Sequence, residues 1–167
     1  MNIKPITELI KSVLFTIALV FWYSEIKAEG ATNSSVSYEM ALADAARIAQ
    51  TNQNWAVMRC AGVSMEPFYG QDSIIVVDKV EISDLRSGMI AVYRDADGVL
   101  VAHQVIEATS SQAWGQGVNN KQRDPDPITA DNLSGVVFTI LHTSGQPVAG
   151  ILAQADTLPV VHGKTYN

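Results

Sequence analysis

This chain of 167 residues lacks most of the patterns that indicate a disulfide, a cofactor or a nucleic acid. It has one cysteine, Cys60, so no internal disulfide can form. Its eleven Lys and Arg are scattered and its formal net charge is −6, which disfavours nucleic-acid binding. No zinc-ligand spacing, HExxH, GxGxxG or P-loop pattern occurs. The sequence therefore predicts neither a metal nor an organic cofactor.

Charge and long apolar runs are also scarce. Only 17% of the residues are charged, too few for a disordered or coiled-coil chain, while 47% are hydrophobic, enough for the core of one ordinary domain. The longest apolar run, residues 13–23, has eleven residues, which is short for a helix that needs about twenty to span a bilayer. The composition predicts a single folded domain.

That apolar run follows Lys4 and Lys11 and precedes a small residue, Ala28. A basic start, a short apolar centre and a small residue at the end are typical of a cleaved secretory signal. Trp22 and Tyr23 lie where interfacial aromatics would hold a retained membrane anchor. In both cases we expect residues 29–167 outside the cytoplasm, exported to the periplasm or cell exterior or anchored to the membrane. A buried domain helix is the third alternative.

The rest of the chain predicts a mainly β fold with one preceding helix. Ser37 is expected to cap a helix over residues 38–50, after a polar linker over residues 30–36. Short β-branched and apolar runs separated by polar turns follow, which is typical of a barrel or coiled sheet. The expected strands cover residues 55–60, 73–80, 89–94, 99–108, 113–117 and 133–142. The domain plan is a signal or anchor at 1–28, linker and helix at 29–54, a catalytic domain at 55–142, and a tail of uncertain structure at 143–167.

A serine on a tight loop and a histidine on a later strand suggest nucleophilic catalysis. Ser64 lies between Gly62 and Pro67, where we expect an exposed side chain on a turn, and His103 follows 39 residues later. A serine hydroxyl needs a neighbouring base to take its proton, and histidine titrates in the right range, at roughly pH 6.5 when unperturbed. Each residue alone is more often an ordinary turn serine or strand histidine. Cys60 is expected to be a small buried filler rather than a nucleophile.

Several ordered segments resemble the signal peptidases and the self-cleaving repressors related to them. The loop Gly-Val-Ser-Met-Glu-Pro at residues 62–67 is similar to their nucleophile loop, and residues 72–77 and 88–94 are similar to the strands after it. Val-Ala-His-Gln-Val-Ile at residues 101–106 falls where the family keeps its general base. Bacterial members have lysine at that place, so the resemblance implies the Ser-His branch typical of the endoplasmic reticulum and archaea.

The resemblance also implies a third catalytic residue. Residues 117–120 and 124–128 are similar to the family's next loop, in which Asp124 takes the place of an aspartate that orients the histidine. Asp126 is the fallback candidate. Met65 and Pro67 are expected to hold and shape the nucleophile loop. Lys79, a rival base by analogy with bacterial members, is expected to be a surface charge.

Two positions depart from the family pattern. Val118 stands where a first aspartate is expected, and Gly62 stands where many members have a serine that donates to the oxyanion. An oxyanion here would depend on backbone N–H groups, such as that of Ser64. The departures keep open a catalytically silent, exported β domain that binds peptides or protein partners.

The sequence thus favours a serine endopeptidase of signal-peptidase type. Ser64, His103 and Asp124 are its candidate catalytic residues, and Gly62, Met65 and Pro67 its loop-shaping or oxyanion residues. The implied substrate is an exported polypeptide segment, bound in extended form beside a strand edge. No metal, cofactor or nucleic acid is expected, and a membrane partner follows only if the N-terminal segment is an anchor. A self-cleaving repressor is disfavoured because residues 1–60 offer an apolar segment instead of a helix-turn-helix.

Overall fold

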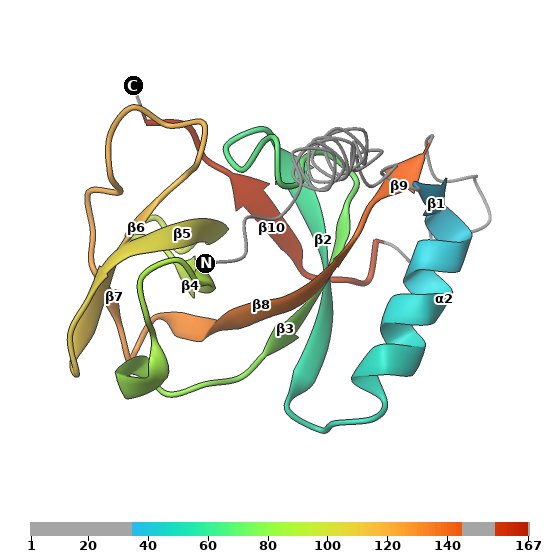
Figure 1. The fold of residues 1–167 in the computed structure, drawn as a ribbon, viewed down its shortest axis with the longest axis horizontal. Coiled ribbons are helices and arrows are strands. Elements are labelled where there is room, and N and C mark those ends of the chain that lie inside the picture. The colour runs from blue at the N-terminus through green and yellow to red at the C-terminus, as the bar shows by residue number, and fades with distance from the viewer. Residues whose placement is uncertain (1–34, 145–155, 167) are drawn as a thin grey trace, which may run out of the picture. The chain divides into compact units, whose positions relative to one another are not determined.

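The computed structural model describes residues 35–144 and 156–166, and these form a mainly β structure with one α-helix (Figure 1). The signal or anchor expected at residues 1–28 lies outside the described residues. The elements in chain order are β1 (Val36–Ser37), α2 (Tyr38–Ala49), β2 (Trp55–Gly62), β3 (Ile74–Asp78), the 3₁₀ turn η1 (Ile82–Asp84), β4 (Ile90–Arg94), β5 (Leu100–Ala108), β6 (Gln112–Gln116), β7 (Ile128–Thr129), β8 (Leu133–Leu141), β9 (Thr143–Ser144) and β10 (Val160–Gly163).

Six of the strands close into a barrel. The sheet order is β10-β2-β3-β8-β4-β5-β6-β7, and a further pairing between β10 and β5 joins its ends into a ring of β10, β2, β3, β8, β4 and β5. Strand β10 runs parallel to β2, whereas the pairs from β2 to β5 around the other side of the ring are antiparallel. Closure removes the exposed edges that an open sheet of this size would leave. Strand β10 therefore completes the ring by pairing with both β2 and β5.

The strands bury side chains on both faces, because successive apolar residues point alternately into the barrel interior and into a cluster outside it. In β3, Ile75 and Val77 pack in the barrel interior, while Ile74 and Val76 pack under the helix. In β5, Ala102 faces the barrel interior and Val101 faces a second cluster formed with β4, β6 and β7. This explains why residues 74–77 of β3 are all apolar instead of alternating with polar residues.

Helix α2 packs against the outside of β2 and β3 (Figure 1). The side chain of Ser37 accepts a hydrogen bond from the N–H of Met40 at 3.3 Å, which caps the first turn as the sequence predicted. Tyr38, Ala41 and Ala45 are fully or almost fully buried and form its contact stripe. The expected linker ends earlier than predicted, because Val36 already pairs with Thr143 in β1 and β9.

The predicted strands agree with β2, β3, β4, β5, β6 and β8 to within a few residues at each end. The sequence did not predict the short elements β1, η1, β7, β9 and β10. The largest difference lies in the C-terminal segment, to which the sequence assigned no structure: β10 is a wall of the barrel. The barrel therefore includes residues beyond His142.

Candidate active site

Ser64 lies two residues after the end of β2, in a loop held by turn hydrogen bonds. The N–H groups of Glu66 and Phe68 donate to the carbonyls of Val63 and Met65 at 3.2 and 2.9 Å. Met65 is 2% exposed and packs in the barrel core, so its side chain fixes the loop from inside. Pro67 follows a cis peptide bond in the same turn. These contacts place Met65 and Pro67 where the sequence predicted loop-holding residues.

Gly62 begins the loop with a backbone that favours glycine. Its φ is +104°, and a Cβ at this position would lie 2.7 Å from the carbonyl oxygen of Gly163 on β10. Its N–H donates to the side-chain oxygen of Gln71 at 3.1 Å. Gly62 thus serves the turn and the close approach of two backbones, and it supplies no side chain toward an oxyanion.

His103 lies on β5 opposite Ala91, with its ring wholly buried. Its Nε2 lies 3.0 Å from the Oγ of Ser64, within hydrogen-bond distance. The structure therefore brings together the two residues that the sequence paired across 39 positions.

The other ring nitrogen of His103 faces Asp124, which is 3% exposed. Nδ1 lies 2.7 and 2.9 Å from the two carboxylate oxygens. Because a carboxylate can only accept, this contact places a hydrogen on Nδ1 and leaves Nε2 as the acceptor for the hydroxyl of Ser64. Asp124, and not the fallback candidate Asp126, is the acidic residue next to the histidine.

Tyr93, on β4, adds a further donor to this chain of contacts. Its hydroxyl donates a hydrogen bond to Oδ2 of Asp124. Burial and the nearby Asp124 raise the pKa of the Tyr93 phenol, so it stays neutral and keeps its proton. The buried carboxylate is therefore satisfied from two sides, by His103 and by Tyr93.

The loop after β6 holds the nucleophile loop in place. The N–H of Asn119 donates to the carbonyl of Ser64 at 2.8 Å, and its side chain donates to the carbonyl of Val63 at 3.3 Å. A Cβ on Gly117 would lie 2.9 Å from the Cβ of Ser64. Gly115 is similarly close, because a Cβ there would lie 2.6 Å from both the Tyr93 hydroxyl and Oδ2 of Asp124. Both glycines leave room for the side chains of the site.

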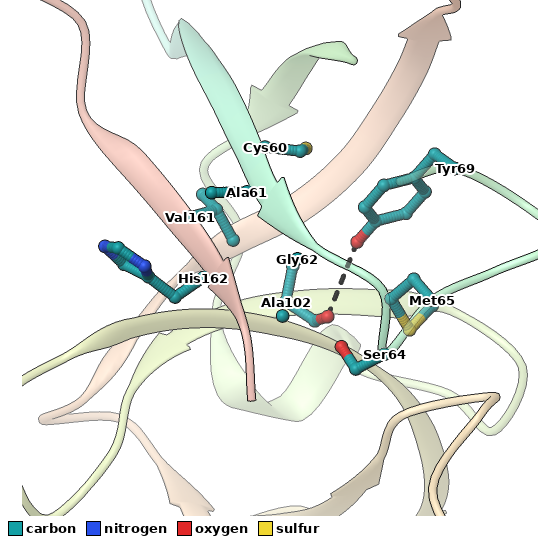
Figure 2. Close-up of a pocket in the computed structure, with 10 residues that line it drawn as sticks. Cys60, Ala61, Gly62, Ser64, Met65, Tyr69, Ala102, Val161 and His162 are labelled. Atoms are coloured by element: carbon teal, nitrogen blue, oxygen red, sulfur yellow. Dashed lines mark hydrogen bonds between the residues drawn. The ribbon is translucent and has the colours of Figure 1, made fainter. Parts of the chain in front are cut away.

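A small pocket beside Ser64 is lined by residues of β2, the loop after it, β5 and β10. Figure 2 shows Val161 of β10 between the two strands, His162 pointing away from β2, and Ser64 next to the end of β10. The Tyr69 hydroxyl reaches across this pocket and donates to the carbonyl of Ala102 at 3.4 Å. The backbone N–H of Ser64 makes none of the turn and loop hydrogen bonds of the described residues.

The exposure of Ser64 differs from the sequence-based expectation. We expected an exposed serine on a turn, but Ser64 and His103 are both 0% exposed. The residues close to Ser64 include Gly117 and Gly163, which lie in the loop after β6 and at the end of β10. The correction has a physical cause, because β10 was not predicted and it covers the end of β2.

Two rival catalytic residues lie in unsuitable surroundings. Cys60 is 3% exposed, and burial raises the pKa of its thiol to about 12, so it is a neutral core residue. Lys79 is exposed and its N–H donates to Asn54, at the end of the sheet where Asp78 pairs with Trp55, far along β2 from Gly62. Val118, at the place of the family's first aspartate, is 37% exposed.

Sequence reasoning missed two parts of the site, Tyr93 and the segment that includes Gly163, and it missed the ion pairs of Asp95 and Asp97 with the residue after Gly163. Tyr93 has the pattern of any core strand tyrosine, so no sequence signal marks its contact with Asp124. Asp95 and Asp97 have the pattern of turn residues, and the structure also pairs both with the Lys164 ammonium at 2.5 and 2.7 Å. Gly163 belongs to a segment with no periodic pattern.

No group of three or more His, Cys, Asp or Glu in the described part of the chain could hold a metal ion. Within those same ranges, no helix has the length and apolar character needed to cross a membrane.

No protein-family model matches this sequence, and no curated protein is significantly similar to it.

Proposed function

We propose that the protein is a serine endopeptidase of the signal-peptidase type. The observation that carries the proposal is the continuous set of contacts from the Ser64 hydroxyl to His103 Nε2, and from His103 Nδ1 to the Asp124 carboxylate, at 3.0 and 2.7 Å. A serine, a histidine and a carboxylate in this order define a nucleophile, its base and the group that orients the base, whatever the fold around them.

The reaction follows from these contacts. Oγ of Ser64 attacks the carbonyl carbon of a peptide bond while Nε2 of His103 takes the hydroxyl proton. Asp124 stabilises the imidazolium that forms, and the backbone N–H of Ser64 donates to the oxyanion. His103 then returns the proton to the leaving amine. Water, activated by the same histidine, hydrolyses the acyl-enzyme and restores Ser64. No cofactor takes part in these steps.

The expected substrate is an exported polypeptide segment in extended form. Strand β2 ends beside Ser64, and its edge there is paired with β10, so a segment that took the place of β10 would bring its backbone to the nucleophile. The resemblance of the nucleophile loop, the His103 strand and the Asp124 loop to signal peptidases supports a small side chain next to the scissile bond. It also supports a site of action outside the cytoplasm, with residues 1–28 as a cleaved signal or retained anchor.

One observation supports a second function. Because Ser64 and His103 are 0% exposed, the domain could bind extended peptides without cleaving them. This alternative is a catalytically silent peptide-binding β domain. It predicts saturable peptide binding by the unaltered chain and no difference in peptide integrity between that chain and Ser64→Ala.

The proposal is tested by incubating the purified full chain with a mixed library of natural peptides and reading new termini by mass spectrometry. We expect cleavage sites that share a small residue before the cut, and none with Ser64→Ala, which removes one oxygen atom and serves as the matched blank. Identical peptide patterns for the two proteins, with both folded by circular dichroism, would overturn the peptidase and leave the silent domain.

A further inference from the structure

Ser64 is covered by the chain's own C-terminal segment. A Cβ built on Gly163 would lie 3.0 Å from Oγ of Ser64, so this glycine stands directly beside the nucleophile. Tyr166 places its ring edge-on to His103, with centroids 6.3 Å apart. Both catalytic side chains are 0% exposed. A peptide carbonyl from another molecule therefore cannot reach Ser64 while this segment stays in place.

The segment enters the site as a strand. Val160–Gly163 pairs in parallel with Arg59–Gly62 of β2, and His162 also pairs with Val101 of β5. The side chain of Val161 is buried at 2% exposed and packs with the barrel core (Figure 2). An extended peptide bound between the strand before the nucleophile and the strand of the base would take this same place.

The residues after Gly163 are held on the far side of Ser64. Asn120 donates through its side chain to the carbonyl of Lys164 at 2.9 Å, and the N–H of Lys121 donates to the carbonyl of Tyr166 at 3.3 Å. The Lys164 ammonium contacts the carboxylates of Asp95 and Asp97 at 2.5 and 2.7 Å. The segment is thus fixed both before and after the glycine that faces the nucleophile.

The Lys164 contacts form an ion pair that persists at neutral pH. Burial opposes ionisation of Asp95, but hydrogen bonds from Lys164 and from the N–H groups of Val99 and Asp97 outweigh it and lower the pKa of the carboxyl. The hydrogen bond to Asp95, and to a lesser extent that to Asp97, raises the pKa of Lys164. The side chain of Asp95 is 5% exposed and that of Asp97 is 75% exposed, so Lys164 contacts one buried and one exposed carboxylate.

We propose that residues 160–166 are an intramolecular ligand of the substrate groove, and that a peptide must displace them and pair with Asp95 and Asp97 in their place. The inference rests on the proposed function and adds to it a substrate class. The preferred peptide is extended, with a buried apolar residue where Val161 lies, glycine where Gly163 faces Ser64, and a basic residue next to that glycine. The acidic pair gives the groove a site for that basic residue.

The test uses the full chain with Ser64→Ala, so that no chemistry takes place. The probe is a fluorescent peptide with the sequence of residues 158–166, measured by polarisation. In this background Lys164→Glu turns the ion pair into a repulsion, so the occupied fraction of the groove falls and the apparent affinity for the peptide rises, by about fivefold or more. Hydrogen exchange at the edge of β2, residues 59–62, should become faster in the same variant.

Three controls make the result specific. Lys79→Glu makes the same charge change at the other end of β2 and should leave affinity and exchange unchanged. Adding Asp97→Lys to Lys164→Glu places a cation opposite the new glutamate, so hydrogen exchange at residues 59–62 should slow again toward its starting rate. A peptide with glutamate in place of its lysine should bind the Lys164→Glu protein at least about threefold more weakly than the lysine peptide.

Equal peptide affinity and equal exchange in Lys164→Glu and Lys79→Glu would overturn the intramolecular ligand. This outcome is independent of the peptidase proposal, because the measurement needs no nucleophile. The converse result is release of the segment and tight peptide binding, but no cleavage by the chain that retains Ser64. It would support residues 160–166 as an intramolecular ligand and reject the peptidase.

Discussion

Replacing His103 by alanine is expected to lower kcat/KM for peptide cleavage by about a thousandfold or more. In the structure its Nε2 is the polar atom within hydrogen-bond distance of the Ser64 hydroxyl, at 3.0 Å. Without it, the hydroxyl must lose its proton to water during attack, and the leaving amine has no positioned donor. The loss should fall mainly on kcat, because the buried His103 contributes little to the binding energy of the peptide before the reaction begins.

The matched control for His103→Ala is His142→Ala. His142 follows β8, and its carbonyl accepts a hydrogen bond from the N–H of Val36, a contact that does not need its side chain. We expect its kcat/KM to stay within about twofold of the unaltered chain. Because His103 is fully buried, its removal also leaves a cavity, so urea unfolding must show that the variant is folded during the assay. Undiminished cleavage by folded His103→Ala would contradict the proposed base.

Replacing Asp124 by asparagine is expected to lower kcat by about a hundredfold to ten-thousandfold while keeping the shape of the site. The carboxylate holds the hydrogen of His103 on Nδ1, through contacts at 2.7 and 2.9 Å. An amide can donate to Nδ1 instead, which moves the hydrogen to Nε2 and leaves no acceptor for the Ser64 proton. Nitrogen NMR of the imidazole would show this tautomer change directly.

Tyr93→Phe shows how much of the effect of Asp124 comes from its charge and how much from the hydrogen bond that positions it. This variant keeps the carboxylate and removes one hydrogen bond to it, so we expect kcat to fall by only about tenfold. The matched control is Tyr38→Phe, because Tyr38 is also buried but its hydroxyl has no hydrogen-bond partner among the described residues. If Asp124→Asn cost no more than Tyr93→Phe, the carboxylate would be a packing group and not the partner of the base.

Much of the barrel could be predicted from the sequence because its longer strands carry strong local signals. Residues 74–77 of β3 are β-branched and apolar, and the turn after β4 contains Gly98 at φ +76°, a conformation that favours glycine. The cap of α2 by Ser37 is likewise a local interaction. These elements follow from the period of the side chains and from turn chemistry, so no knowledge of distant contacts was needed.

Strand β10 could not be predicted in the same way. Its four residues, Val160–Gly163, are too short to show an alternating pattern, and they become a strand because β2 and β5 offer unpaired edges. The burial of Ser64 follows from this distant pairing and was missed for the same reason. Strand pairing between residues a hundred positions apart is a tertiary property.

The candidate site was predicted in part. Ser64 and His103 could be paired only because their ordered surroundings resemble one family, and Asp124 followed from that resemblance alone. The structure places all three in contact, whereas their catalytic roles remain a proposal. The contact of Tyr93 could not be predicted, because a core tyrosine and a tyrosine that donates to a buried carboxylate have the same local sequence pattern.

The proposed function depends on one step, the activation of the Ser64 hydroxyl by His103. Its most direct test is site-resolved labelling of the full chain and of its Lys164→Glu variant with a small fluorophosphonate, followed by peptide mapping. We predict phosphonylation at the Ser64 oxygen, faster in Lys164→Glu, and slower by about a thousandfold when His103 is alanine. Absence of label on Ser64 in both folded proteins, or labelling at the same rate without His103, would contradict this activation.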